Sequence, residues 1–528
     1  MEPTAAKTKT DAEASGNGTA PATETFDVHN PADGSVIETV EVASPERVAE
    51  VVARVRAAQP EWEAMGFKER YRWLGRLRDW MIDNADALAD LMQSETGKVR
   101  ADAELEAPFI CDAINFWGQR AAGFLADETP SSHNPMFKVK RLRITYRPNP
   151  VVGVISPWNF PLILAFDDAI PALMAGAAVV VKPSEVTPLI AMEIARAWKE
   201  EVGGPDVIDV VNGTADTGGA LIDEADFIQF TGSDRTGRVV MKRAADTLTP
   251  VSLELGGKDP MIVLRDANVD RAANAAAFGG LGNTGQICMA IERVYVEEPI
   301  YDEFVDKLTK RVRELRQGVD DRSFKQDVGA MTFPPQVDIV SDHVEDAREK
   351  GARITTGGQR KDGPGNWYEP TVIADADHSM KVMVDETFGP VLGVMKVADA
   401  DEAIRMANDT RYGLSASVMS RDTKHAERVA RKLEVGAANI DDVLTNYFLQ
   451  DLPMGGWKSS GVGFRHGEYG IKRFCRTEAI VSPRLPQGKC DPMWFPHRAR
   501  DRRIVAAVFR FINARGLRNR LGIGKSRS

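Results

Sequence analysis

The stretch Val151-Val-Gly-Val-Ile-Ser-Pro-Trp-Asn-Phe-Pro161 marks the point at which the chain changes to alternating strands and helices. Its first five residues form a short apolar run, which is typical of a strand buried on both faces of a parallel sheet. Similar runs follow at 177–181, 207–211 and 227–230, with helical stretches between them. This order predicts an α/β protein with a doubly wound parallel sheet, in which ligands bind beyond the carboxyl ends of the strands.

Residues that suit a dinucleotide follow these predicted strands. They are Ser156, Trp158, Lys182, Ser184, Glu185, Gly213, Gly218, Gly232, Ser233 and Gly237. Glycine turns alone are a weak signal, although such a turn can admit a diphosphate near a helix start. Lys182 and Glu185 are placed to bond ribose hydroxyls, with an exposed salt bridge as the alternative. A carboxylate there would repel a 2′-phosphate, so the sequence favours NAD as the cofactor and leaves NADP as the second choice.

A cysteine and a glutamate further along the chain carry a second chemical signal. Cys288 follows a small-residue turn in Gly285-Gln-Ile-Cys-Met289, and Glu254 lies in the glycine-flanked run Leu253-Glu-Leu-Gly-Gly-Lys258. A thiol nucleophile and a carboxylate that activates water are the groups needed for covalent acyl chemistry. The alternatives are a cysteine that only fills the core and a glutamate in a structural ion pair.

Composition sets limits on the class of protein. At 528 residues the chain is too long for one core, and 43% apolar with 27% charged residues is typical of a soluble globular protein. Its four cysteines and seven histidines are scattered, which predicts neither a disulfide framework nor a metal site. We expect a cytoplasmic protein that does not bind nucleic acid.

The charge is unevenly distributed. The chain has a net charge of −10, and the segment from Arg498 to the end carries +9, so the remainder carries −19. Ile504, Val508 and Phe511 share one face of a predicted helix in this basic tail. Peripheral contact with anionic lipid is one interpretation, and docking on a neighbouring subunit or on the acidic body is the other. The first 24 residues resemble a disordered leader and not a signal peptide.

Seven motifs in a fixed order carry a family resemblance. They are Pro157-Trp-Asn-Phe-Pro161, Lys182-Pro-Ser-Glu185, Phe230-Thr-Gly-Ser233, Leu253-Glu-Leu-Gly-Gly-Lys258, Gly285-Gln-Ile-Cys288, Glu386-Thr-Phe-Gly-Pro-Val391 and Pro453-Met-Gly-Gly-Trp-Lys458. Over residues 26–482 the chain resembles the aldehyde dehydrogenase superfamily. Within that superfamily, its sequence is similar to the succinate-semialdehyde dehydrogenases of actinobacterial type.

The resemblance implies a domain plan. We expect a disordered leader at 1–24, an NAD-binding domain at 25–135 and 149–254, and a catalytic domain at 255–473. A bridging β-hairpin for oligomerisation is expected at 136–148, completed by a strand at 474–486. The basic extension occupies 487–528. The implied assembly is a homodimer or a homotetramer.

The resemblance also implies roles for single residues. Cys288 is expected to attack an aldehyde, with the Asn159 amide and the Cys288 backbone N–H holding the oxyanion. Its thiol pKa should be lowered, or its proton taken by a neighbour. Glu254 is expected to activate the water that hydrolyses the thioester. Glu386 would bind the nicotinamide ribose, Phe388 would pack near the ring, and Leu255 would line the cofactor site.

The sequence does not decide which aldehyde is the substrate. The expected pocket residues are Trp117, Phe160, Leu164, Phe448 and Met454. They suit an apolar or aromatic aldehyde, whereas the branch similarity suggests succinate semialdehyde. Many family members have Lys where this chain has Asp168, and an aromatic residue is frequent at Asp167. Two acids there disfavour a substrate carboxylate unless an arginine compensates, and they would suit an amino-aldehyde. A coenzyme-A-acylating enzyme is a further alternative, against which Glu254 argues, and a catalytically silent binding protein is made improbable by the intact Cys288.

Overall fold

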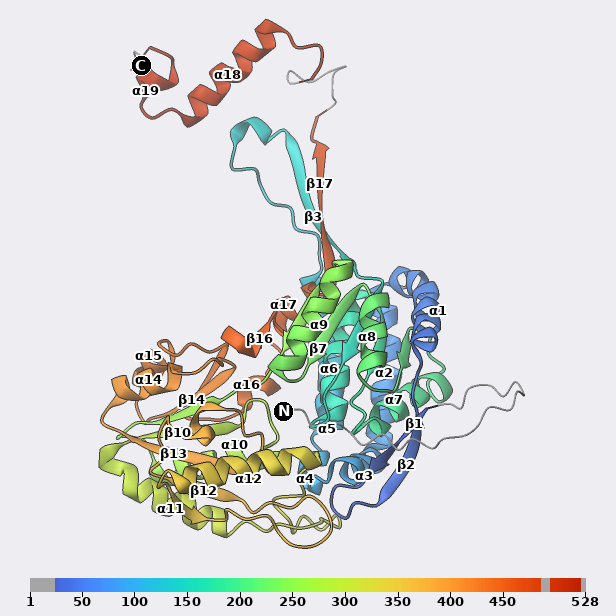
Figure 1. Cartoon of the computed structure of the whole chain (residues 1–528). Helices are drawn as coiled ribbons and strands as arrows, with labels where there is room; N and C mark the ends of the chain where they lie inside the picture. Colours follow the sequence, from blue (N-terminus) through green and yellow to red (C-terminus); the bar gives the residue numbers. More distant parts are fainter. Residues whose placement is uncertain (1–23, 486–493, 524–528) are drawn as a thin grey trace, which may run out of the picture.

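Two parallel sheets form the body of the molecule, and a long two-stranded arm projects from it (Figure 1). The computed structural model describes residues 24–485 and 494–523. The predicted leader therefore lies outside the described residues except for Glu24, as do 486–493 and 524–528 of the predicted C-terminal segments. The predicted α/β fold class is confirmed.

The first sheet contains the apolar runs that the sequence analysis singled out. Its strands are β4 (Val151–Ile155), β5 (Ala178–Lys182), β6 (Ile208–Val210), β7 (Phe227–Thr231), β8 (Val251–Glu254) and β16 (Gly461–Val462), in the spatial order β16-β8-β7-β4-β5-β6. Every residue of β4, β5 and β7 is buried, as expected when helices cover both faces of a parallel sheet. Of these described strands only β16 is antiparallel to its neighbour, and it joins Gly461 to Glu254.

Helices from two stretches of the chain surround this sheet. They are α1 (Pro45–Ala64), α2 (Gly66–Asp83), α3 (Ala85–Thr96), α4 (Arg100–Ala103), α5 (Glu106–Phe124), α6 (Pro161–Ala175), α7 (Leu189–Glu200), α8 (Ala215–Glu224) and α9 (Asp234–Thr247). A small pair, β1 (Thr25–His29) and β2 (Val36–Glu41), lies beside them. Helix α6 begins with Pro161 and ends at left-handed Gly176. All of its residues are buried, so its adjacent acids Asp167 and Asp168 need partners inside the protein.

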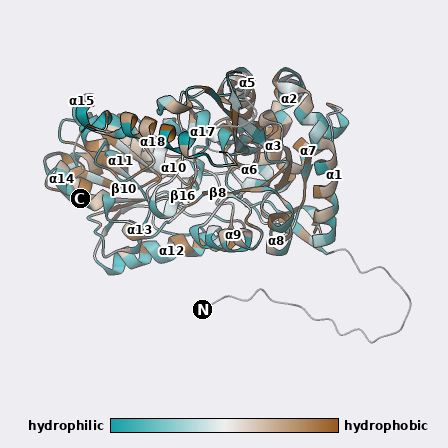
Figure 2. Ribbon diagram, turned by 90° about the horizontal axis from the view of Figure 1, so that it is seen from above, coloured by the Kyte–Doolittle hydropathy of each residue, from teal (hydrophilic) through white to brown (hydrophobic). Residues whose placement is uncertain are grey.

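The second sheet follows Glu254 directly. Its strands are β9 (Asp259–Val263), β10 (Ile291–Glu297), β11 (Arg353–Thr356), β12 (Thr371–Ala374), β13 (Val391–Val397), β14 (Ser415–Met419) and β15 (Ala437–Ile440). Its helices are α10 (Val269–Leu281), α11 (Tyr301–Arg313), α12 (Pro334–Glu349), α13 (Lys381–Val384), α14 (Ala400–Asn408), α15 (Thr423–Ala430) and α16 (Thr445–Phe448). The later helix α17 (Gly467–Lys472) packs instead on α5 and α6 beside the first sheet. Among these strands of the described chain only the edge strand β11 is antiparallel to its neighbour. Figure 2 shows hydrophilic residues along the outer helices of this part, such as α12 and α15.

The arm consists of β3 (Lys140–Pro148) and β17 (Cys475–Pro483), which are antiparallel and pair along their whole length. The segment 136–148 thus contributes β3, and its partner β17 lies in the segment 474–486 that was expected to complete the arm. Beyond the arm lie α18 (Ala499–Asn513) and α19 (Leu517–Arg520), at the top of Figure 1. The predicted domain boundaries and the role of the arm in oligomerisation remain predictions. No helix among the described residues is long and apolar enough to cross a membrane.

Candidate active site

The turn before Cys288 has a backbone conformation that few residues adopt. Asn283, Thr284 and Gly285 have φ values of +48°, +58° and +73°, so three successive residues are left-handed. Such conformations cost free energy in non-glycine residues and are frequent at functional sites. A Cβ atom on Gly285 would lie 2.1 Å from the carbonyl oxygen of Gly389, so the backbones approach closely. This buried turn presents the half-buried Cys288 just before strand β10 of the second sheet.

Asn159 contacts the segment that carries Cys288. Its side-chain Nδ2 donates to the carbonyl oxygen of Gln286 at 2.9 Å, and Asn283 Nδ2 donates to the same oxygen at 3.2 Å. The side chain of Gln286 accepts from the backbone N–H of Thr332 at 2.8 Å. Asn159 therefore lies beside the cysteine segment, with one amide hydrogen committed and the other available.

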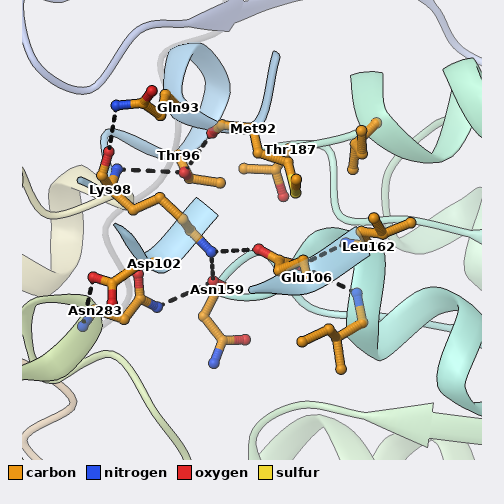
Figure 3. A network of polar contacts seen from close by, with 12 residues as sticks. Met92, Gln93, Thr96, Lys98, Asp102, Glu106, Asn159, Leu162, Thr187 and Asn283 are labelled. Atoms are coloured by element: carbon orange, nitrogen blue, oxygen red, sulfur yellow. Dashed lines mark hydrogen bonds and ion pairs between the residues drawn. The ribbon is translucent and has the colours of Figure 1, made fainter. Parts of the chain in front are cut away.

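A buried ion pair fixes the backbone of Asn159 (Figure 3). Lys98 Nζ donates to Glu106 Oε1 at 2.5 Å and to the Asn159 carbonyl oxygen at 2.9 Å. Asn283 Nδ2 donates to this carbonyl as well, at 3.1 Å, and its backbone N–H donates to Asp102 at 3.1 Å. The other Glu106 oxygen accepts the first free N–H groups of α6. None of these supporting residues was predicted as part of the site. The signal present in the sequence was an acid, Glu106, in the first turn of α5.

Glu254 is the last residue of β8 and has no local partner. Its side chain is buried, and neither carboxyl oxygen has a hydrogen-bond partner among the described residues. Burial raises the pKa of this carboxyl to about 7, with Asp168 and Asp167 acting in the same direction and Arg465 and Arg473 opposing. A carboxylate with that pKa is suited to general-base catalysis near neutral pH.

The surroundings of Cys288 favour the thiol over the thiolate. Burial raises its pKa to about 12, and the nearby charges of Asp259, Glu254 and Glu386 add to the effect against Arg465. The expectation of a lowered pKa is therefore wrong, because burial and these acids outweigh the effect of Arg465. The other expected route, in which a neighbouring base takes the proton, is the one compatible with this environment.

Asp167 and Asp168, adjacent residues of α6, each have buried partners. Asp168 accepts from Arg465 at 2.8 and 3.2 Å and also from Arg473. Asp167 accepts from Gln450 at 3.0 Å and Tyr447 at 3.3 Å, and it pairs with His466 at 2.7 Å. Arg465 is the arginine that sequence reasoning could not place. It lies in the glycine-flanked run Gly463-Phe-Arg-His-Gly467, which gives a signal only once its distant partner in α6 is known.

The predicted cofactor residues lie at the carboxyl ends of the first sheet or in the turns that follow it. After β4, Ser156 Oγ is buried and has no partner among the described residues, and Trp158 packs against Phe388. After β5, Lys182 Nζ donates to the Pro183 carbonyl at 2.9 Å and pairs with Glu185 at 3.4 Å. An orphaned hydroxyl, a lysine and a half-exposed carboxylate at adjacent strand ends fit a nucleoside ribose.

The other cofactor candidates are turn residues. Gly213 precedes α8, and Gly218 lies in its first turn. Gly232 and the cap residue Ser233 precede α9, and Gly237 lies in the first turn of α9. A Cβ atom on Gly237 would lie 2.6 Å from the side chain of Leu255. These small residues keep the approach to the helix starts open.

Glu386 and Phe388 reach the same region from the second sheet. Glu386 accepts from the Gly257 backbone N–H at 3.0 Å, and burial raises its pKa to about 8. Phe388 has a φ of +50°, and its backbone N–H donates to Glu292 at 2.8 Å. Glu292 also forms an ion pair with Lys258, so this loop is held close to the segment that follows Glu254.

The predicted pocket residues occupy different depths. Trp117, Leu164 and Met454 are buried. Lys98 Nζ lies 4.3 Å from the centre of the Phe160 ring, and Phe448 is 46% exposed. An aromatic group that the sequence analysis missed joins them. Phe109 stacks on Tyr447 with ring centres 5.5 Å apart and meets Phe448 edge-on at 5.7 Å.

A parallel-sheet cofactor fold combined with a cysteine and an unpaired buried glutamate defines a dehydrogenase class that oxidises aldehydes. The chain belongs to the aldehyde dehydrogenase family, whose model matches residues 19–480. It is therefore an NAD(P)-dependent aldehyde dehydrogenase.

Individual relatives cover most of the chain. It is 40% identical over 474 residues to a 4,4'-diapolycopene aldehyde oxidase of Methylomonas sp, covering 89% of this chain and 88% of that protein. A Mycolicibacterium smegmatis protein with the provisional name succinate-semialdehyde dehydrogenase for NADP(+) is 38% identical over 469 residues, covering 87% and 90%. The solved betaine aldehyde dehydrogenase of Staphylococcus aureus, in complex with NAD+, is 32% identical with a TM-score of 0.83, covering 89% and 93%.

Proposed function

We propose that the protein oxidises an aldehyde to a carboxylic acid in two half-reactions on Cys288. The observation that carries this proposal is Glu254, a buried carboxyl without a partner among the described residues, in the electrostatic reach of the Cys288 thiol. An unpaired buried acid is costly to stability, so its retention in this position favours a role in the reaction.

In the first half-reaction the Cys288 sulfur bonds to the aldehyde carbon, and the thiol proton passes to a neighbouring base. The free amide hydrogen of Asn159 and the Cys288 backbone N–H stabilise the oxyanion of the thiohemiacetal. The chemistry that a bound nicotinamide supplies is hydride acceptance from this carbon, which leaves a thioester on Cys288. The residues proposed to hold it are the strand-end and turn residues described above, together with Glu386 and Phe388.

In the second half-reaction Glu254 removes a proton from water, which attacks the thioester carbon. The acid leaves, and the Cys288 sulfur recovers a proton. Resolution by coenzyme A is the alternative outcome for the thioester. The buried position of Glu254 beside Cys288 favours hydrolysis.

For the cofactor we propose a preference for NAD over NADP. Glu185 lies three residues after Lys182 at the end of β5, and its charge opposes a 2′-phosphate. Relatives with provisional NADP(+) names support NADP as the second candidate.

For the substrate we propose an uncharged apolar or aromatic aldehyde. The aromatic group around Tyr447 supports this choice, and Arg465 and Arg473 are both hydrogen-bonded to Asp168. The provisional names of relatives support succinate semialdehyde as the second candidate. The paired state of Asp167 and Asp168 removes the argument for an amino-aldehyde.

The test is NADH production with a panel of aldehydes, with and without coenzyme A. We expect turnover of benzaldehyde or a medium-chain aldehyde without coenzyme A, and weaker turnover of succinate semialdehyde. Cys288→Ala should abolish turnover and keep NAD binding. Residual dehydrogenase activity in this variant would refute the nucleophile assignment, and strict dependence on coenzyme A would refute the hydrolytic route.

We propose that the arm formed by β3 and β17 mediates a homo-oligomer. Ile480 and Val481 of β17 are exposed on it, and an exposed strand of this kind is a ready pairing surface. A chain in which both residues are changed to Lys should have a smaller sedimentation coefficient. An unchanged coefficient would contradict the proposal.

We also propose that the C-terminal extension makes peripheral contact with anionic membranes. No residue of α18 is buried, and exposed bulky apolar side chains alternate there with arginines. The exposed bulky apolar side chains of the extension are Trp494, Phe495, Ile504, Phe509, Phe511, Leu517, Leu521 and Ile523. A basic amphipathic helix of this kind is typical of the lipid interface.

Co-sedimentation with phosphatidylglycerol-containing vesicles tests this contact. Binding should fall with salt, with truncation after Leu485, and with Ile504→Ser/Phe511→Ser, while phosphatidylcholine vesicles bind weakly. Equal vesicle binding by the truncated chain would refute it. A smaller oligomer after truncation would indicate docking on a neighbouring subunit instead.

A further inference from the structure

We propose that Arg465 and Arg473, held by Asp168, are positioning residues that keep Glu254 in the ionised form it needs as a base. This inference rests on the proposed function of Glu254. It concerns a charge arrangement that follows from Asp168, the residue at which this chain departs from the lysine that many family members carry.

Arg465 lies where the neighbouring strands β7 and β8 end, at Thr231 and Glu254. Its guanidinium is 1% exposed and donates to Asp168 at 2.8 Å and to Thr231 Oγ1 at 2.8 Å. Thr231 is the register partner of Glu254 between β7 and β8. On the other edge of β8, Gly461 pairs with Glu254, only four residues before Arg465. Both neighbours of Glu254 in the sheet thus bring Arg465 toward it.

Arg473 reaches the same strand from the end of α17. It donates to Ser252 Oγ at 3.1 Å and to Asp168. Ser252 is two residues before Glu254, and side chains two apart in a strand point to the same face. The two guanidinium groups therefore face the side of β8 from which the Glu254 carboxyl projects.

Charges of both signs surround Glu254. The guanidinium groups of Arg465 and Arg473 both donate to Asp168, and together they favour the ionised form of Glu254. Asp167 on the same helix is engaged by His466, Gln450 and Tyr447. From the side of the second sheet, the Cys288 thiol lies within electrostatic reach of both Glu254 and Glu386. Burial favours the protonated acid, Asp168 and Asp167 act in the same direction, and Arg465 and Arg473 oppose this effect.

Removal of a positive charge and removal of a negative charge near Glu254 should therefore shift the pH profile of kcat in opposite directions. Arg473→Gln removes a positive charge, so the acid limb of kcat should shift to higher pH by about one unit or more. Asp168→Asn removes a negative charge, and the acid limb should shift to lower pH. In both variants the pre-steady-state burst of NADH should persist, because formation of the thioester does not depend on Glu254 as a water-activating base.

Arg476→Gln is the matched control, since this arginine is exposed and pairs with Asp226 outside the site. Its pH profile should match that of the unaltered enzyme. A merely structural role would lower activity in both variants without opposite shifts, and coincident acid limbs would overturn the inference. Glu254→Gln separates it from the proposed function. A burst without steady turnover supports Glu254 as the base, whereas full steady turnover would overturn both.

Discussion

Lys98→Met is the substitution that best tests how the site is held together. Lys98 and Glu106 are an ion pair whose side chains are 1% and 0% exposed, and Lys98 also supports the Asn159 carbonyl. Removing one partner of a buried pair leaves an uncompensated charge, which typically costs about 3–5 kcal/mol. We expect a clear fall in the thermal midpoint, which differential scanning calorimetry can measure.

The same substitution should weaken catalysis. Without Lys98, Asn283 becomes the only side chain of the described network that donates to the Asn159 carbonyl. The Asn159 amide would then be less well fixed against Gln286. Complete loss of an oxyanion donor costs about 10²–10³ in rate, so a misplaced donor should cost up to about 10² in kcat/KM.

A double variant separates stability from positioning. In Lys98→Met/Glu106→Gln both charges of the ion pair are removed together, and the amide oxygen of the introduced glutamine can still accept the N–H groups that begin α6. Stability should largely return, while kcat/KM stays low because the donor to Asn159 is still missing. Recovery of activity together with stability would refute a positioning role for Lys98. Lys307→Met, at a surface pair, is the control and should change stability by about 1 kcal/mol or less.

Three further results are expected. Gly285→Ala should lower both thermal stability and activity, because it adds a Cβ 2.1 Å from the Gly389 oxygen at a left-handed position; a fully active variant would contradict this reading. Glu185→Ser should raise kcat/KM with NADP and lower it with NAD, and an unchanged ratio would count against the ribose role. Alkylation of Cys288 by iodoacetamide should accelerate with pH up to at least about pH 10, because its pKa is about 12, and a plateau below about pH 8 would disprove the high pKa.

The sheet could be predicted from the sequence because its strands are short apolar runs with local boundaries. The runs at 151–155, 177–181 and 227–230 correspond to β4, β5 and β7 within one residue at each end. The arm was harder to predict, because β3 pairs with a strand more than three hundred residues away. Alternation along one strand indicates a partner and does not identify it, so the partner at 474–486 was expected from the family resemblance alone.

The residues of the site also differ in how readily the sequence alone identifies them. Cys288, Glu254 and Asn159 belong to motifs that are recognisable within a few residues of sequence. Lys98 and Arg465 do not, since each is defined by a partner on another element. Their meaning depends on burial, because an exposed lysine or arginine would be only a solvated charge.

The buried charges around Cys288 are more than a source of stability. A buried ion pair can often be replaced by apolar residues without loss of stability, so stability alone does not explain why Lys98 and Arg465 lie here. Each of them binds two separate parts of the chain at once: Lys98 joins α5 to the Asn159 turn, and Arg465 joins α6 to the end of β7. Apolar packing could fill these places but could not direct an amide or bias the charge of a carboxyl. The departure at Asp168 therefore changes the electrostatic surroundings of Glu254 while leaving Cys288, Asn159 and Glu254 themselves in place.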